Sequence, residues 1–283
     1  MVVYAGQGDP RRSMALLWRT GKADDGPTPG PRPALSVDLI VEAALAVADV
    51  EGMAALSMRA VGDRLGRTAM ALYTYVPGKA ELIDLMYDRV LAELPTDYDL
   101  DAGWRAAVTA WAEDFWALCL RHPWLLQVSH ARPVLGPNEY VMTETLVRIV
   151  HRTGLAGPLL WRVVGTLLNF VRGAAGTVAE ARQARAVTGV SDDQWWQARS
   201  AMLDEMAPDF ADRFPMLTRL AGERAFEMAD PDTPYLEQEA RETFEVGLAL
   251  LLDGIETTLI RAIQPSPHPS GGGNGVSGGG GRT

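Results

Sequence analysis

The sequence contains little cysteine and no long uninterrupted apolar segment. Cys119 is the only cysteine among 283 residues, so the chain can form neither an internal disulfide nor a cysteine metal cluster. The longest apolar stretch, residues 159–171, is interrupted by Arg162 and Asn169 and is too short to span a membrane. The start of the chain also lacks the apolar core of a secretory signal. We therefore expect a protein of the reducing cytoplasm with no membrane partner.

Signatures of enzyme chemistry are missing as well. The chain has four histidines, which are His122, His130, His151 and His268, and each stands isolated in the sequence. There is no H-E-x-x-H motif, no serine elbow and no phosphate-binding glycine loop, because the glycines near the end of the chain precede neither Lys-Ser/Thr nor a helix. We expect no catalytic residues, no metal and no cofactor.

Alternating β-branched runs are scarce, whereas apolar residues recur three and four positions apart, which predicts an all-α fold without strands. Ser36 and Gly52 have the residue types that begin and end helices, and Ser191 with Gln194 forms a capping box. The predicted helices cover residues 36–52, 57–65, 68–75 and 79–94, a helix from about 101 to Pro123, and helices over 137–152, 158–187, a stretch after 191, and 234–263.

The two ends of the chain differ in composition from the rest. Residues 1–35 are rich in proline and glycine and are expected to form a flexible, largely extended arm, and residues 264–283 a disordered glycine-rich tail. The arginines of the arm either contact DNA phosphates or belong to a solvated tail. Between the ends we predict a small domain over 36–95 and a larger helical domain over 96–263.

The net charge of −10 is unevenly distributed. The first 92 residues carry 10 basic and 11 acidic side chains, whereas the remainder carries 16 and 25. Because local fields at a binding face matter more than the total, this acidity weakens the case for nucleic-acid binding by the first part without excluding it.

Residues 56–79 have the spacing of a helix-turn-helix. Gly66 supplies the conformation that ends the first helix, and Thr68 is placed to cap the second. Leu72 and Val76 then bury the inner face of the second helix. The same spacing also fits a plain helical hairpin, in which the neighbouring tyrosines pack.

A helix of this kind fits the major groove of DNA. We predict that Arg59 donates two hydrogen bonds to guanine, and that Lys79 holds a phosphate at the start of the following helix. Small residues such as Ala71 can approach thymine methyl groups, and tyrosine hydroxyls reach phosphates or bases. The complete predicted DNA-binding set is Arg59, Thr68, Ala69, Met70, Ala71, Tyr73, Tyr75 and Lys79.

The spacing of Leu56-Ser57-Met58-Arg59, Leu65-Gly66, Leu72-Tyr73, Tyr75-Val76 and Lys79-Ala80-Glu81-Leu82 closely resembles the TetR/AcrR regulators. The match spans about residues 35–94. More weakly, Trp104, Phe115, Asn169-Phe170-Val171-Arg172-Gly173 and Phe244-Glu245-Val246-Gly247-Leu248 resemble the C-terminal domain of the tetracycline-repressor-like branch. The resemblance implies an all-helical, Ω-shaped homodimer with a four-helix interface built from residues 158–187 and 234–263.

The resemblance also implies a small-molecule effector bound inside the larger domain. The candidate walls and polar anchors are Trp111, Phe115, His130, Arg132, Met142, Trp161, Asn169, Phe170 and Arg172, although each apolar member is also an ordinary core residue by type. Thr177 occupies what resembles the acidic position of the magnesium–tetracycline site, so a mostly apolar or aromatic effector fits better than tetracycline.

The predicted function is a ligand-responsive regulator, a repressor that an effector releases from a palindromic operator in double-stranded DNA. Two alternatives remain open at this stage. One is a transcriptional activator of the same fold, and the other is a helical partner-binding protein whose DNA-reading part is degenerate.

Overall fold

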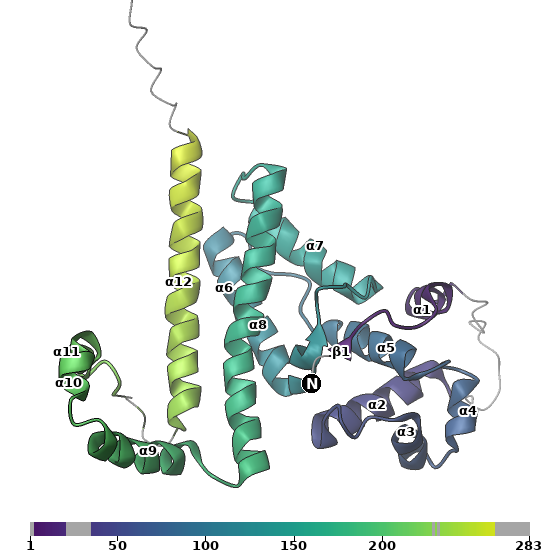
Figure 1. Ribbon diagram of the computed structural model, residues 1–283. Helices are drawn as coiled ribbons and strands as arrows, with labels where there is room; N and C mark the ends of the chain where they lie inside the picture. The colour runs from purple at the N-terminus through teal and green to yellow at the C-terminus, as the bar shows by residue number, and fades with distance from the viewer. Residues whose placement is uncertain (1–2, 21–34, 228–229, 231–232, 264–283) are drawn as a thin grey trace, which may run out of the picture.

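Two groups of helices meet in this protein, as Figure 1 shows. The computed structural model describes residues 3–20, 35–227, 230 and 233–263. The smaller group, called the head below, consists of α2 (Val37–Glu51), α3 (Met58–Leu65), α4 (Ala69–Tyr73) and α5 (Lys79–Leu91). The larger group, called the body, consists of α6 (Trp104–Arg121), the 3-10 helix η1 (Pro123–Gln127), α7 (Pro137–His151), α8 (Gly157–Thr188) and α12 (Tyr235–Ile263). The predicted all-α class is confirmed.

The helices of the head begin and end where local chemistry dictates. The Ser36 hydroxyl accepts a hydrogen bond from the Leu39 amide at 3.2 Å and so caps α2. At the other end, Gly52 adopts a φ of 79°, which is open to glycine but costly for other residues. The predicted helix over 79–94 is shorter, because α5 ends at Leu91 and the chain then forms a tighter turn before Pro95.

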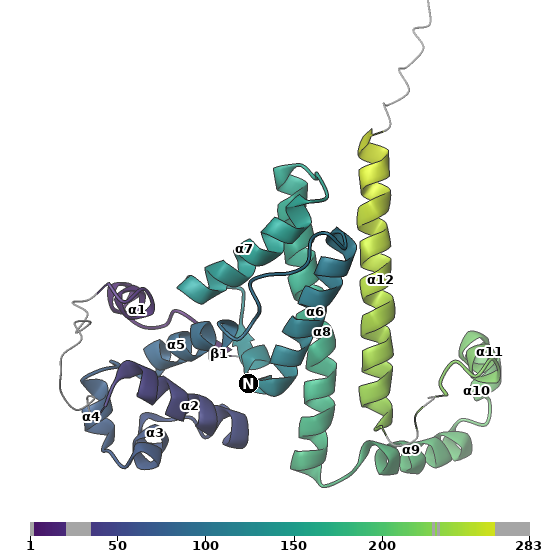
Figure 2. The ribbon, with the colours of Figure 1, turned by 180° about the vertical axis from the view of Figure 1, so that it is seen from behind.

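The body packs around side chains from α6, α7 and α8. Trp111, Phe115 and Leu146 are almost completely buried there. Phe244 attaches α12 to the rest of the body, because the centroid of its ring lies 4.4 Å from the ring centroid of Trp116 and 5.8 Å from that of Phe170. Figures 1 and 2, which view opposite sides, both show α12 running alongside α8. Among the described helices, none combines the length and apolar character that a membrane span requires.

Three short helices project from the body between α8 and α12, and we call them the paddle. They are α9 (Asp192–Met206), α10 (Phe210–Arg213) and α11 (Pro215–Gly222). The predicted capping box at Ser191 and Gln194 is present at the start of α9. In Figures 1 and 2 the paddle extends away from the head and lies beside the outer side of α12.

The prediction of an extended N-terminal arm is wrong for its described part. Residues Pro10–Leu17 form α1, which Asp9 caps by accepting from the Arg12 amide at 2.9 Å, with Pro10 at a favoured first position. The expectation of no strand is also corrected, because β1 (Val3–Tyr4) pairs in parallel with β2 (Val128–Ser129). Apart from Pro10, the prolines of the arm come after α1 in the sequence, so they do not interrupt it. Residues 21–34 and the predicted tail over 264–283 lie outside the described residues.

Candidate functional site

The turn between α3 and α4 is held by interactions within a few residues. Ser57 caps α3 by accepting from the Ala60 amide at 3.1 Å, and Gly66 ends it in the left-handed conformation with a φ of 64°. Thr68 then accepts from the Ala71 amide at 3.3 Å. A methyl group at Gly62 would lie 2.7 Å from the Arg67 carbonyl oxygen, so the turn packs directly on the backbone of α3. The predicted helix-turn-helix is therefore formed.

The short helix α4 has one buried and one exposed side. Leu72 and the following Val76 are fully buried in the head. On the opposite side Met70 is 76% exposed, and Tyr73 and Tyr75 are partly exposed, at 46% and 39%. The predicted contact residues Ala69 and Ala71 are half-buried next to them. The arrangement presents a small surface with apolar and phenolic groups beside the turn.

Exposed basic side chains lie on α3, on the turn and at the start of α5, the segments that precede and follow α4. Arg59 is 89% exposed and lies 3.8 Å from Asp63 one turn along α3. Lys79 is exposed at the start of α5, where Gly78 supplies no side chain to cap the first amides. Arg64 and Arg67 are exposed as well, although they were not in the predicted set. The sequence indicates them only as two basic residues on either side of the turn glycine, Gly66.

The predicted effector-binding residues differ in burial, and only some of them lie in the core of the body. Trp111, Phe115, Met142 and Arg172 are buried in the body, and the first two rings lie 5.3 Å apart. Phe170 instead stacks on Phe244. His130 Nε2 and Asn169 Oδ1 form a hydrogen bond of 2.9 Å near the surface, and Arg132 is exposed. Trp161 is 55% exposed on the outer side of α8.

Among the residues that the structure describes, two buried side chains have nitrogen atoms without a hydrogen-bond partner. Arg172 is only 8% exposed, and its Nη2 donates to the Val128 carbonyl at 3.0 Å and the Leu125 carbonyl at 3.3 Å. Its Nη1 and the indole Nε1 of Trp111 are buried and unpaired. An unpaired buried donor costs about 1–3 kcal/mol, so these two groups are suited to a hydrogen-bond acceptor that enters the body.

Burial and charge also act on other groups around this core. Burial raises the pKa of Tyr87 to about 12, against the opposing effect of the nearby Arg172 guanidinium. Burial likewise raises the pKa of the Cys119 thiol to about 12, again opposed by Arg172. Both side chains are therefore neutral at physiological pH, and Cys119 is an unreactive core residue. The described residues contain no group of three or more histidine, cysteine, aspartate or glutamate side chains placed to hold a metal.

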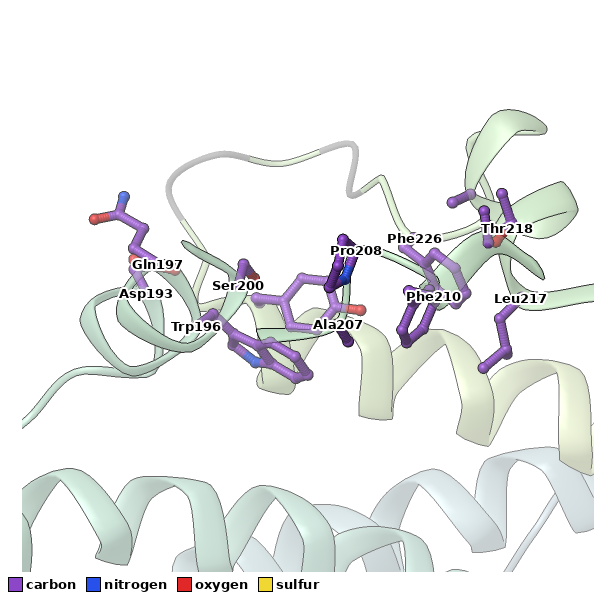
Figure 3. Close-up of a pocket in the computed structure, with 13 residues that line it drawn as sticks. Asp193, Trp196, Gln197, Ser200, Ala207, Pro208, Phe210, Leu217, Thr218 and Phe226 are labelled. Carbon is purple, nitrogen blue, oxygen red and sulfur yellow. The ribbon is translucent and has the colours of Figure 1, made fainter. Parts of the chain in front are cut away.

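The paddle contains a hollow that sequence reasoning missed. Its volume is about 1010 Å³, and its apolar lining includes Trp196, Phe210, Leu217 and Phe226. Figure 3 shows Trp196, on α9, and Phe210 among the side chains that line it. The paired tryptophans after the capping box were the only signal in the sequence, because the hollow depends on how α10 and α11 fold back.

The head and the body are joined by part-buried polar contacts around the buried His122. His122, at the end of α6, has Nδ1 2.8 Å from Asp49 of α2 and Nε2 3.2 Å from Glu93 after α5. The Trp124 indole donates to the same Asp49 carboxylate at 2.7 Å. Burial of Glu93 opposes ionisation, but hydrogen bonds from Arg121 and His122 lower its pKa overall. His122, isolated in the sequence, thus connects three helices in space.

These features define a helix-turn-helix DNA-binding protein with a separate helical body. Residues 40–86 match the family described as bacterial regulatory proteins, tetR family, and residues 97–259 match the family described as tetracyclin repressor-like, C-terminal domain. The chain belongs to the TetR family and is a DNA-binding regulator of transcription.

Relatives with known names support this assignment. The HTH-type transcriptional repressor DrrR1 of Streptomyces coeruleorubidus is 40% identical over 253 residues, which are 89% of this chain and 87% of DrrR1. Apo ActR from Streptomyces coelicolor has a similar structure, with a TM-score of 0.63 and 25% identity over 82% of this chain and all of ActR. ActR in complex with actinorhodin gives a TM-score of 0.62 and 25% identity over 81% of this chain and 98% of ActR.

Proposed function

We propose that this protein is a homodimeric repressor whose heads bind a palindromic operator and whose bodies bind a small effector that releases it. The observation that carries the proposal is the exposed face of α4, which lies beside exposed cations in a correctly capped helix-turn-helix. The 40% identity with the repressor DrrR1 supports repression over activation. The proposed regulator acts in the cytoplasm, where it has access to the chromosome.

The DNA contacts divide by chemistry into base readout and phosphate binding. Arg59, with its guanidinium in solvent, is the proposed guanine reader, and the N-terminal half of α4 is proposed to face the base edges of the major groove. Lys79 is proposed to hold a phosphate, helped by the first amides of α5. Arg67 in the turn is a further proposed phosphate contact, since phosphate binding needs only an exposed cation near the backbone.

The proposed dimer interface uses the outer faces of α8 and α12. Leu159 and Trp161 on α8, and Val246 and Leu250 on α12, are large apolar side chains with 41–66% exposure in the single chain. Exposed apolar residues of this size along two adjacent long helices are typical of a surface that a partner covers. A dimer places two heads on one DNA molecule, which explains the expectation of a palindromic operator.

The proposed effector is an aromatic molecule that carries hydrogen-bond acceptors. Trp111 and Phe115 provide aromatic surface in the body, and the unpaired donors of Trp111 and Arg172 need acceptor oxygens. ActR, which has the same fold, is known in complex with actinorhodin. The hollow of the paddle is a second candidate location, favoured by its size and aromatic lining.

Repression in this scheme requires unequal binding of the effector to two states. The effector lowers DNA affinity only if it prefers the arrangement in which the heads do not fit the operator. We propose that the boundary between the two domains falls near residue 95, where the turn after α5 ends. His122 and its carboxylate partners lie at this junction, so movement of the body is transmitted to the head there.

A selection of random DNA duplexes on the purified protein, followed by gel-shift assays, tests the proposal. We expect enrichment of an inverted repeat and a specific shift at moderate salt. Failure to enrich any sequence would contradict it and favour a partner-binding role. A panel of aromatic compounds with carbonyl or phenolate oxygens is then screened for release of the DNA. Quenching of tryptophan fluorescence by the effector then locates its site. An altered quenching in Trp111→Phe indicates the body site, and an altered quenching in Trp196→Phe indicates the paddle site.

A further inference from the structure

Residues 3–18 precede the part of the chain that matches the TetR family, yet they contact both the head and the body. We call these residues the N-terminal strap. Its first residues form β1, with Val3 opposite Val128 and Tyr4 opposite Ser129 of the body. Its helix α1 lies next to α5 of the head, as Figure 1 shows in purple. The strap therefore crosses the junction between the two groups of helices.

On the head side, the strap is attached to carboxylates of α5. The Gly6 amide donates to Asp84 Oδ1 at 2.9 Å, and the Ser13 hydroxyl donates to Asp84 Oδ2 at 3.4 Å. The Asp9 amide donates to Glu81 Oε1 at 3.2 Å. A methyl group at Gly8 would lie 2.0 Å from the same Glu81 oxygen, so the strap backbone rests directly on this side chain. Asp84 is only 2% exposed, and its hydrogen bond with Ser13 is buried, whereas the hydrogen bonds from the Gly6 and Asp9 amides are part-buried.

On the body side, the end of α1 is attached to the segment that leads into α7. The Trp18 indole donates to the Leu135 carbonyl at 2.9 Å, and its ring lies 6.0 Å from that of Tyr140. Leu135 has a φ of 62°, which is uncommon for a residue other than glycine. Its own amide donates to Glu139 Oε2 at 2.7 Å, so the carbonyl that accepts from Trp18 is held in place.

A third carboxylate on the same face of α5 joins the head to α7 directly. Glu81, Asp84 and Asp88 are three and four positions apart, so they form one row along the helix. Asp88 Oδ1 accepts from the amides of Asn138 at 2.9 Å and Glu139 at 3.0 Å, and so caps α7. One row of buried carboxylates thus connects α5 both to the strap and to the body. A change in the angle between α5 and α7 therefore has to break contacts of α5 with the strap or with the body.

We propose that the strap is a positioning segment that fixes α5, and with it the whole head, in one orientation against the body. Its removal or loosening widens the range of head orientations and weakens operator binding, although the strap itself does not contact DNA. The attachment is a property of a single chain. Only the effect of this attachment on operator binding rests on the proposed function.

Hydrogen exchange of the full-length protein without DNA tests the attachment. Trp18→Phe removes the indole donor and keeps an aromatic ring, and Asp84→Asn removes the charge and keeps the shape. We expect amide exchange in residues 79–91 and 135–141 to accelerate roughly five- to tenfold, as expected for one lost hydrogen bond. Arg11→Ala, on the exposed side of α1, is the matched control and should leave exchange unchanged. Unchanged exchange in both Trp18→Phe and Asp84→Asn would overturn the proposal.

Gel shifts with the selected operator over a salt series test the consequence. Trp18→Phe and Asp84→Asn should weaken binding several-fold without changing the salt slope, because neither removes a phosphate contact. If Arg11→Ala instead weakens binding and lowers the slope, the arm is a DNA contact and the positioning role is rejected. Failure of the unaltered protein to bind any DNA would defeat the proposed function alone, since the exchange experiment is independent of DNA.

Discussion

Arg59 lies in the first turn of α3 with its guanidinium in solvent, and its only described ionic partner is Asp63, 3.8 Å away. A pair of this exposure and distance contributes little to stability, so the head does not need Arg59 for folding. The Arg59→Ala change should cost about 1–3 kcal/mol on the selected operator and relax the preference at one base pair. Fluorescence anisotropy with single-base operator variants measures both effects. An equal loss on random DNA would reject base readout.

Lys79 differs from Arg59 in the chemistry proposed for it. An ammonium group beside helix amides recognises a phosphate, which is the same for every sequence. Lys79→Ala should therefore weaken binding to specific and random DNA alike and lower the slope of log affinity against log salt by about one. Arg89→Ala, exposed in the last turn of the same helix, is the control and should leave the slope as it is. A normal slope in Lys79→Ala would exclude the phosphate contact.

At the scale of the element, α5 is unusual because it buries carboxylates on the face that joins the head to its neighbours. Burial raises the pKa of Asp84 and Asp88, although hydrogen bonds from Gly6, Ser13, Asn138 and Glu139 oppose the shift. Burial also raises the pKa of Glu139 at the start of α7. An acid whose pKa is higher in the folded than in the unfolded state binds protons preferentially when folded. The stability it contributes is full below its unfolded pKa and is lost as the pH rises through its folded pKa.

The fall in stability with rising pH gives a prediction for Asp88, whose ordinary pKa is 3.8. As the pH rises from about this value, deprotonation of Asp88 should lower the free energy of unfolding by about 1.4 kcal/mol per unit of pKa shift. Asp88→Asn keeps an oxygen that can accept from the α7 amides and should remove this part of the pH dependence. Urea unfolding across the acidic range measures it. If Asp88→Asn shows the same fall in stability with pH as the unaltered protein, burial of Asp88 is not its cause.

At the scale of the whole molecule, the outer faces of α8 and α12 predict a dimer at micromolar concentration, which light scattering can measure. Leu250 is 66% exposed on α12. Leu250→Asp places a charge in the proposed interface, and because burying an unpaired charge is costly, the dimer should dissociate and operator affinity should fall. Val50→Asp, at a site 78% exposed in the head, is the matched control. A monomeric unaltered protein would contradict the proposed assembly.

The distribution of charge is also a property of the whole molecule. The acidic excess lies after residue 92, where the body and the paddle are, and the head is nearly balanced. The field of the body therefore opposes contact with DNA, while the exposed cations beside α4 favour it locally. The charge orients the molecule with its head toward the duplex.

Local features of this protein follow directly from its amino-acid sequence. Ser57, Gly66 and Thr68 act on backbone groups three or four residues away, so their effect on α3 and α4 follows from residue type and spacing. The same holds for the capping box at Ser191. These short-range interactions, together with the apolar spacing, were sufficient to predict the all-α fold. The same spacing in residues 56–79 also fitted a plain helical hairpin, and the resemblance to the TetR/AcrR regulators favoured the helix-turn-helix.

Which distant groups meet depends instead on how the helices pack. Gly6 and Asp84 are 78 positions apart, and Trp18 and Leu135 are 117 apart, so no pattern along the chain indicates that the strap attaches to α5 and the body. The predicted effector residues differ in burial for the same reason, because helical spacing indicates which side chains share a face of a helix but not which neighbouring helix covers that face. The unpaired donors of Trp111 and Arg172 likewise depend on everything packed around them. Local chemistry sets the elements, and long-range packing sets how they are joined.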